Sequence, residues 1–244
     1  MSQPVAIITG ASRGIGAAAA ILLAERGFSI CVNYLNAKEK AEEVVNAIKH
    51  KNGKAIAIKA DMGNENEIMR LFADVDAALG PVSALVNNAG INGGSCDLAS
   101  ISFDTLHSVF AINVFGTFIA CREAIKRMKQ IGGGNIVNIS SEAAKFGGTK
   151  IAHYSASKAA INTFTLALAR ETAPFNIRVN AVSPGVIDTE IHHASSPERI
   201  ENLLKSLPMG RMGKTEEVAE LIGWLLSPQS SYVSGAIIPV TGSR

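Results

Sequence analysis

Residues 9–16 read TGASRGIG, directly after an apolar run at 5–8 and directly before an alanine-rich stretch that ends at Gly27. Glycines let a backbone turn tightly and approach a ligand, and the positive end of a following helix favours an anion. The stretch therefore predicts a strand-to-helix turn in which a pyrophosphate can sit. A tight connection without a ligand is the alternative, because the glycine spacing differs from the common dinucleotide pattern.

Strand and helix signals alternate along the rest of the chain. Short apolar runs predict strands at 5–8, 28–32, 55–58, 84–86, 135–139, 177–182 and 236–240. Longer amphipathic stretches predict helices near 15–26, 37–51, 64–79, 103–129, 155–172 and 215–226. The alternation predicts an α/β fold, a doubly wound seven-stranded parallel sheet of the Rossmann type with helices on both faces. In such sheets ligands bind beyond the carboxyl ends of the strands.

Length and composition favour a single domain over residues 1–244. A chain of 244 residues with 47% hydrophobic content can build one full core. The segment 186–208 interrupts the alternation with polar residues that include His192 and His193. Because this segment follows the sixth predicted strand, we expect it to be a mobile lid over a substrate site.

Charge, hydropathy and cysteines exclude several classes of protein. A net charge of +2 from scattered basic residues argues against a nucleic-acid partner. No apolar stretch suggests a membrane span or a signal segment, so we expect a soluble cytoplasmic protein with no membrane partner. The three cysteines, Cys31, Cys96 and Cys121, have no metal-ligand spacing and suit a reducing compartment, so no metal is expected.

Tyr154, Lys158 and Ser141 form the candidate catalytic set. Tyr154 and Lys158 are four residues apart in a predicted helix, which places them on one face. A nearby ammonium lowers the pKa of a phenol and makes it a better proton donor and acceptor at neutral pH. Tyr34 and Lys38 have the same spacing, but Tyr34 ends a predicted strand, where residues four apart are not same-face neighbours.

The end of the second predicted strand indicates which dinucleotide binds. A carboxylate there would accept hydrogen bonds from a ribose 2′-hydroxyl, but the chain has Asn33, Tyr34 and Asn36 and no acidic residue before Glu39. Arg13 in the glycine turn offers a guanidinium to a 2′-phosphate. The sequence therefore favours NADP(H) over NAD(H); the alternative is an exposed Arg13 and use of both.

Six motifs occur together in an order that resembles the short-chain dehydrogenase/reductase family. The resemblance covers the chain from Val5 to Gly242. Within the family, the chain looks most like NADP-dependent 3-oxoacyl-carrier-protein reductases and glucose 1-dehydrogenases. The motifs are Thr9-Gly10-x3-Gly14-Ile15-Gly16, Asn87-Asn88-Ala89-Gly90, Asn113, Ser141, Tyr154-x3-Lys158 and Pro184-Gly185-x3-Thr189.

The resemblance implies a hydride transfer between NADP(H) and a carbonyl or secondary alcohol. Tyr154 would be the general acid or base, Lys158 would lower its pKa and hold the nicotinamide ribose, and Ser141 would bind the substrate oxygen. Asn113 would support a water that carries the proton to solvent. Ser140 is the weaker serine candidate, because the family spacing to the tyrosine selects Ser141.

The resemblance also implies the cofactor contacts and the assembly. A homotetramer would form through 103–129 and 155–172. The cofactor-binding residues would be Gly10, Ser12, Arg13, Gly14, Ile15, Gly16, Asn33, Tyr34, Asn36, Asp61, Met62, Asn88, Ala89, Gly90, Tyr154, Lys158, Pro184, Gly185, Ile187 and Thr189.

Two functions without turnover remain as alternatives: a dinucleotide sensor or regulator of the same fold, and a structural subunit. For an enzyme, we expect a small-molecule substrate pocket with walls from Glu142, Lys145, Phe146, His153, Val186 and the lid with His192 and His193. His153, beside Tyr154, is interpreted as a surface histidine at a helix start.

Overall fold

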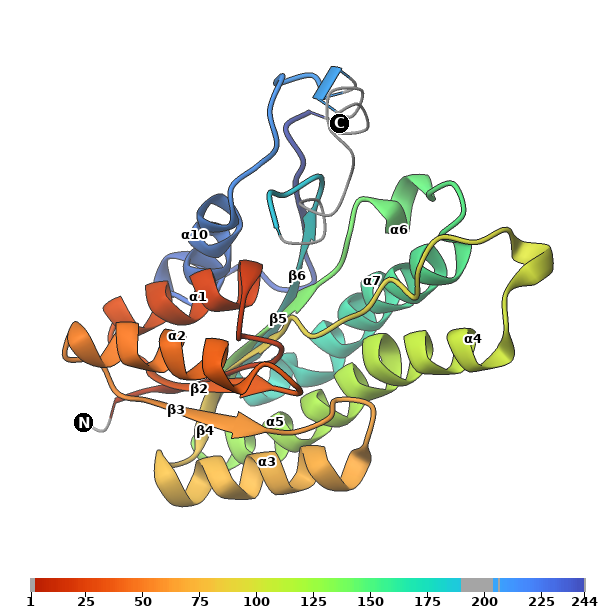
Figure 1. Ribbon diagram of the computed structural model, residues 1–244. Coiled ribbons are helices and arrows are strands. Elements are labelled where there is room, and N and C mark those ends of the chain that lie inside the picture. Colours follow the sequence, from red (N-terminus) through yellow and green to blue (C-terminus); the bar gives the residue numbers. More distant parts are fainter. Residues whose placement is uncertain (1–2, 190–203, 206, 244) are drawn as a thin grey trace.

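The computed structural model describes residues 3–189, 204–205 and 207–243 (Figure 1). Its centre is one sheet of seven parallel strands in the order β3-β2-β1-β4-β5-β6-β7. All seven predicted strands are confirmed, with small shifts at their ends. They are β1 (Val5–Ile8), β2 (Ser29–Tyr34), β3 (Ala55–Lys59), β4 (Val82–Asn87), β5 (Gly134–Ile139), β6 (Ile177–Pro184) and β7 (Ile237–Val240).

Helices cover both faces of the sheet and bury one core on each (Figure 1). One core packs α1, α2 and α10 on the sheet, and the other packs α3, α5 and α7. The helices are α1 (Gly14–Glu25), α2 (Lys38–His50), α3 (Glu65–Ala78), α4 (Phe103–Phe110), α5 (Thr117–Gln130), α6 (Ala143–Phe146), α7 (Ala152–Thr172) and α10 (Thr215–Leu225). Short 3-10 turns are η1 (Leu98–Ser100), η3 (Ala173–Phe175) and η4 (Pro228–Ser230).

The strand order reverses at β1, which pairs with β2 on one side and β4 on the other. At such a switch point the connections leave in opposite directions and open a crevice beyond the strand ends. The glycine turn follows β1, and the Asn88–Gly90 segment follows β4. Both predicted motifs therefore lie at this crevice.

The helix predicted at 103–129 is three pieces rather than one. A π-helix, η2 (Ala111–Gly116), separates α4 from α5 and contains Asn113. Such wider turns frequently occur at functional sites. By length and composition alone Phe103–Gln130 could cross a membrane, but half of its most apolar window is buried inside the fold. Its burial and its contacts with β4 and β5 are those of a core helix.

A residue at the start of the predicted lid pairs with a residue that follows the lid. Ile187 and Gly213 form a parallel bridge, in which the Gly213 amide donates to the Val186 carbonyl at 2.9 Å and the Asp188 amide donates to Gly213 at 2.8 Å. Residues 190–203 and 206, which include His192 and His193, lie outside the described residues. The lid therefore stays a prediction.

Candidate active site

The glycine turn presents backbone amides at the start of α1. Gly10 and Gly14 have φ angles of +61° and +58°, which favour glycine. Arg13 is the N-cap of α1 in an extended conformation, and no side chain caps the helix. The first amides of a helix lack intrahelical partners, so this end suits a phosphate group. The local structure fits the predicted pyrophosphate site.

Thr9 and Asn88 join the glycine turn to the segment after β4. The Thr9 hydroxyl accepts hydrogen bonds from the amides of Asn88 at 3.0 Å and Ala89 at 2.9 Å. The Asn88 side-chain amide donates to the carbonyls of Thr9 at 2.9 Å and Gly10 at 3.0 Å. A Cβ at Gly16 would lie 2.6 Å from the same Asn88 nitrogen. Thr9 was absent from the predicted site, although its place before the first glycine was a usable signal.

Asn33 supports the turn from inside the protein. The side chain is 1% exposed; its oxygen accepts from the Gly10 amide at 3.1 Å and its nitrogen donates to the Ala60 carbonyl at 3.1 Å. These bonds occupy the polar atoms that were expected to face the cofactor. The difference arises because β2 is covered on both faces, so Asn33 is buried within the fold, while Asn36, beyond the strand, is exposed.

The loop after β3 holds Asp61 and Met62 in place. Asp61 accepts a hydrogen bond from the Gly63 amide at 2.7 Å, and its own amide donates to Glu67 at 2.8 Å. Met62 is buried, and its carbonyl oxygen lies so close to Gly116 that any Cβ there would collide with it. The π-helix thus approaches this loop, whose adenine contact stays a prediction.

Ser141, Tyr154 and Lys158 come together at the ends of β5 and α7. Ser141 follows β5, and its hydroxyl forms a hydrogen bond with the Tyr154 side chain. Lys158 is 5% exposed, lies 5.8 Å from the centroid of the Tyr154 ring and donates to the Ile139 carbonyl at 2.7 Å. The geometry brings the three predicted side chains to one place.

Burial dominates the acid–base properties of this set. Desolvation raises the pKa of Tyr154 above its ordinary value, and the hydrogen bond from Ser141 only partly opposes it. Desolvation also lowers the pKa of Lys158 to about 8. The sequence-based expectation of a lowered Tyr154 pKa is therefore wrong in direction, because the spacing argument counted the lysine charge and not the burial of both groups.

Asn113 connects the π-helix with the loop after β4. Its side chain accepts from the Ile91 amide and donates to the Ile91 carbonyl, both at 2.9 Å, and donates to the Ser157 hydroxyl at 3.0 Å. A Cβ at Gly90 would lie 3.1 Å from the Asn113 oxygen and 3.4 Å from the Lys158 nitrogen. The structure thus brings Gly90, Asn113 and Lys158 together.

Ser140 has a different place from Ser141. It is 2% exposed, and its hydroxyl donates to the Lys158 carbonyl at 3.3 Å. The side chain therefore ties β5 to α7, which agrees with its rank as the weaker candidate.

A buried polar network that the sequence analysis missed lies behind the catalytic set. The Asn87 amide donates to Asn138 at 2.9 Å and contacts the Cys121 sulfur at 3.2 Å. Asn138 in turn donates to the Thr165 hydroxyl on α7 at 3.0 Å. Asn138 and Ile139 are consecutive, so β5 contacts α7 at Thr165 and at Lys158. Polar residues at inward positions of an apolar strand were the signal.

The segment after β6 faces the glycine turn. Thr189 contacts the turn, since a Cβ at Gly14 would lie 3.5 Å from its methyl group. Gly185 packs on the Thr241 backbone, where a Cβ would lie 2.9 Å from the Thr241 Cα. Pro184 ends β6, and Ile187 is buried at 5% exposure. Thr189 thus lies beside the glycine turn, and the dinucleotide contacts of these four residues stay a prediction.

His153 is not a surface residue. It is 4% exposed, and its Nε2 lies 2.8 Å from the Asn92 carbonyl. The expectation failed because the loop after β4, distant in sequence, covers the start of α7. Together with Asn113, which holds Ile91, His153 fixes two consecutive residues of that loop.

A family model and curated relatives match nearly the whole chain. The family model, described as Enoyl-(Acyl carrier protein) reductase, matches residues 10–242. An uncharacterized oxidoreductase, YgfF from Escherichia coli, is 43% identical over 98% of this chain and 99% of its own length. The 3-oxoacyl-[acyl-carrier-protein] reductase FabG from Staphylococcus aureus is 37% identical over 97% of this chain and 96% of its own.

Solved structures agree with the fold throughout. A mutant short-chain dehydrogenase/reductase from Serratia marcescens superposes with a TM-score of 0.93 at 34% identity, covering 99% of this chain and 98% of its own. A 7α-hydroxysteroid dehydrogenase complexed with NADH and 7-oxo glycochenodeoxycholic acid gives 0.94 at 35% identity, covering 99% and 94%.

Proposed function

The chain belongs to the short-chain dehydrogenase/reductase family of oxidoreductases, and on that premise we propose that it transfers hydride between NADP(H) and a carbonyl or secondary alcohol. The observation that carries the proposal is the meeting of Ser141, Tyr154 and Lys158 beside Gly90. A bound nicotinamide dinucleotide supplies or accepts the hydride. The chain supplies the proton and the binding groups.

Tyr154 acts as general acid in carbonyl reduction. Its raised pKa keeps the phenol protonated at neutral pH, so it can donate to the substrate oxygen, which Ser141 also binds. In alcohol oxidation the phenol must first lose its proton. We therefore expect reduction to persist from neutral to mildly alkaline pH and oxidation to accelerate as pH rises, a difference that initial rates in both directions would measure.

Lys158 and Asn113 support the proton transfer. Lys158, with a pKa of about 8, is mainly an ammonium at neutral pH and places a positive charge beside the phenol. Asn113 fixes the loop through Ile91, and we propose that it also supports a water in the proton path. Substitution of Asn113 by Leu should lower the rate of carbonyl reduction more at high pH than at low pH, because the path returns a proton to Tyr154 and protons are scarce at high pH.

Substituting Tyr154 by Phe tests the reaction class. NADPH oxidation at 340 nm, screened over acetoacetyl esters and thioesters, diketones, quinones and sugar-derived carbonyls, should fall by about 10²- to 10⁴-fold in the variant. Binding of NADPH, followed by its fluorescence, should remain. A variant that keeps most of the reductase rate would refute the mechanism. An inactive wild-type protein with intact NADPH binding would favour the sensor instead.

The preference for NADP(H) rests on the groups that surround the turn. No carboxylate follows β2 before Glu39, and Arg13 lies at the N-cap of α1. The structure of the related 7α-hydroxysteroid dehydrogenase contains NADH, so the shared fold does not by itself favour the 2′-phosphate of NADP(H). Substituting Arg13 by Ala should weaken NADPH by about tenfold, the cost of one charge-assisted contact, and leave NADH nearly unchanged. Equal losses for both would overturn the preference.

We propose a homotetramer that covers the exposed apolar side chains of α4, η2, α5 and α7. Phe103, Phe115, Phe118 and Leu166 are 76%, 55%, 45% and 41% exposed. Large apolar side chains exposed on elements that contact one another are typical of interfaces. Light scattering on the purified protein should give four copies, and Phe115→Glu should give smaller species; a monomeric wild type would refute the assembly. The aqueous cytoplasmic location stays a prediction.

A further inference from the structure

The loop after β4 contains an Asn-Gly pair, Asn92-Gly93, and the sequence has one other, Asn52-Gly53, after α2. The side-chain amide of an asparagine can be attacked by the backbone nitrogen of the next residue, and a glycine there has no side chain to hinder the approach. Both asparagines are exposed, and both glycines are half-buried. Exposure to solvent therefore does not distinguish the two pairs.

The two glycine amides differ in their hydrogen bonds. The Gly53 amide donates to the Ile48 carbonyl at 3.0 Å, so its nitrogen must give up that bond before it can react. Within the described part of the chain, no group accepts a hydrogen bond from the Gly93 amide. The attacking nitrogen is thus available at Gly93 and occupied at Gly53.

The Asn92 side chain is turned towards the backbone that follows it. Its Oδ1 accepts a hydrogen bond from the Gly94 amide at 3.0 Å. When the Gly93 nitrogen adds to Cγ of Asn92, negative charge develops on this oxygen, and a donor that is already in place stabilises that charge. Among the described residues, no donor binds the Asn52 side chain. A second feature therefore favours reaction at Asn92.

Packing requires a glycine at position 93. Gly93 has a φ angle of +71°, which favours glycine. A Cβ there would lie 2.5 Å from a Val109 methyl carbon and 3.0 Å from His153 Nε2. A bulkier residue at this position, which would hinder the attack, is therefore excluded by the close packing of the loop.

We propose that Asn92 is a site of spontaneous deamidation, which leaves an isoaspartate in the loop after β4 and loosens it. The Gly93 nitrogen loses its proton to solvent and bonds to Cγ of Asn92, and the bond from Cγ to Nδ2 breaks with release of ammonia. Water then opens the succinimide ring at either carbonyl carbon and gives isoaspartate or aspartate. The sum consumes a water and releases an ammonia, without oxidation or reduction.

An isoaspartate changes the backbone between two anchored positions. The chain then runs through Cβ and Cγ of residue 92, which adds one atom to the backbone, and the former carbonyl group of Asn92 becomes a carboxylate. That carbonyl oxygen lies 2.8 Å from His153 Nε2. On the preceding residue, Ile91, both backbone polar groups bind the Asn113 side chain.

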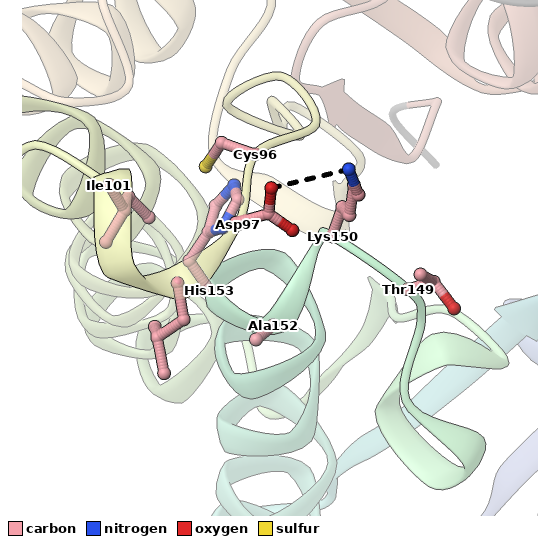
Figure 2. Close-up of a pocket in the computed structure, with 8 residues that line it drawn as sticks. Cys96, Asp97, Ile101, Thr149, Lys150, Ala152 and His153 are labelled. Atoms are coloured by element: carbon pink, nitrogen blue, oxygen red, sulfur yellow. Dashed lines mark hydrogen bonds and ion pairs between the residues drawn. The ribbon is translucent and has the colours of Figure 1, made fainter.

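The far side of the loop is anchored as well. The Cys96 amide donates to the Lys150 carbonyl at 2.9 Å, and the Lys150 ammonium lies 3.4 Å from the Asp97 carboxylate (Figure 2). Because both sides are held, the loop can accommodate the added atom only by losing contacts near residue 92. The isoaspartate form should therefore be less stable than the original chain.

The first test compares the two pairs in one sample. The folded protein is incubated for several days in neutral buffer and digested, and deamidated peptides are measured by mass spectrometry, with an isoaspartate-specific carboxyl methyltransferase as the probe for isoaspartate. Asn92 should react about fivefold faster than Asn52 or more, the factor expected from one hydrogen bond on the attacking amide. In urea, where the bond to Ile48 is lost, the two rates should converge.

Two outcomes would overturn the proposal. Equal rates in the folded protein, or faster reaction at Asn52, would show that Asn92 is not a favoured site. A difference that persists in urea would show that the neighbouring sequence, and not the folded loop, determines the rates.

The second test measures the effect of the product on the fold. Asn92→Gln slows the reaction because its side chain must close a larger ring, and Asn52→Gln is the matched control at the other pair. After incubation, the wild type and Asn52→Gln should melt about 2 °C lower than fresh samples, and Asn92→Gln should not change. An equal fall in both variants would overturn the loosening of the loop. The inference goes beyond the proposed function and is independent of it, since both tests need neither substrate nor cofactor.

Discussion

The two ends of the ligand-binding crevice are stabilised in different ways. At the dinucleotide end, neutral hydrogen bonds from Thr9, Asn33 and Asn88 satisfy buried groups, and glycines let backbones touch. At the catalytic end, burial lowers the pKa of Lys158 to about 8 and raises that of Tyr154. The first end combines binding with stability. At the second end, the burial of ionisable groups lowers the stability of the fold and shifts their pKa values for reaction.

Lys158→Met should show the largest effect. Its activity should fall while its stability rises. We expect turnover to fall by at least about 100-fold. The free energy of unfolding at pH 7 should rise by about 2 kcal/mol, since a buried ammonium is removed and one hydrogen bond to Ile139 is lost. Urea titration measures this change. Tyr154→Phe is the control that loses activity without removing a charge; a destabilised Lys158→Met would argue against the comparison.

Gly16→Ala should damage both properties at the dinucleotide end. The added Cβ would lie 2.6 Å from the Asn88 nitrogen and 2.7 Å from the Gly10 carbonyl oxygen, so the backbones must separate. We expect a loss of about 2 kcal/mol of stability together with weaker NADPH binding. The Cβ of Gly14→Ala would meet only the Thr189 methyl group, at an ordinary contact distance of 3.5 Å, so this variant should cost about 1 kcal/mol through backbone strain alone. Equal costs at the two glycines would show that collision is not the cause.

Thr165→Val tests the polar network behind the catalytic end. The substitution keeps the side-chain shape but leaves the Asn138 amide without its acceptor. An unsatisfied buried donor should cost about 1 to 2 kcal/mol. Thr163→Val, at an exposed position of the same helix, should stay within about 0.5 kcal/mol. If the two variants have the same melting temperature, the network does not stabilise the fold.

The pH dependence of stability should reveal the smallest effect. The folded pKa of Lys158, about 8, is below its ordinary value of 10.5, so between these values the unfolded chain binds more protons. The wild-type protein should therefore gain stability relative to Lys158→Met as pH rises, by about 1 kcal/mol from pH 8 to pH 9. Paired urea titrations across this window would detect it. A constant difference would mean that the lysine is not desolvated.

Periodicity predicted most of the fold, because buried parallel strands are continuous apolar runs and their helices are amphipathic. The strand at 5–8 and the helix at 215–226 were placed within one residue of their observed ends. The π-helix was missed, since one wider turn around Asn113 leaves the apolar pattern nearly unchanged. The side chain of Asn113 in this turn binds Ile91, a residue distant in sequence.

The sequence predicted which residues form the candidate site better than it predicted how buried those residues are. The positions of Ser141, Tyr154 and Lys158 were read from spacing, and the structure brings them together. The predicted direction of the Tyr154 pKa shift was wrong, and the inward orientation of Asn33 was not predicted. Both depend on burial. Burial is a property of the assembled sheet and not of a local motif.

The bridge between Ile187 and Gly213 has an evolutionary consequence. The bridge brings the two ends of the intervening segment together, and none of the seven strands belongs to that segment. Doubling the length of a closed loop costs only about 0.6 kcal/mol. Recombination at these two points could exchange the intervening cassette between relatives while Ser141, Tyr154 and Lys158 remain untouched. A lineage can thereby change which molecules it accepts while its catalytic side chains stay in place.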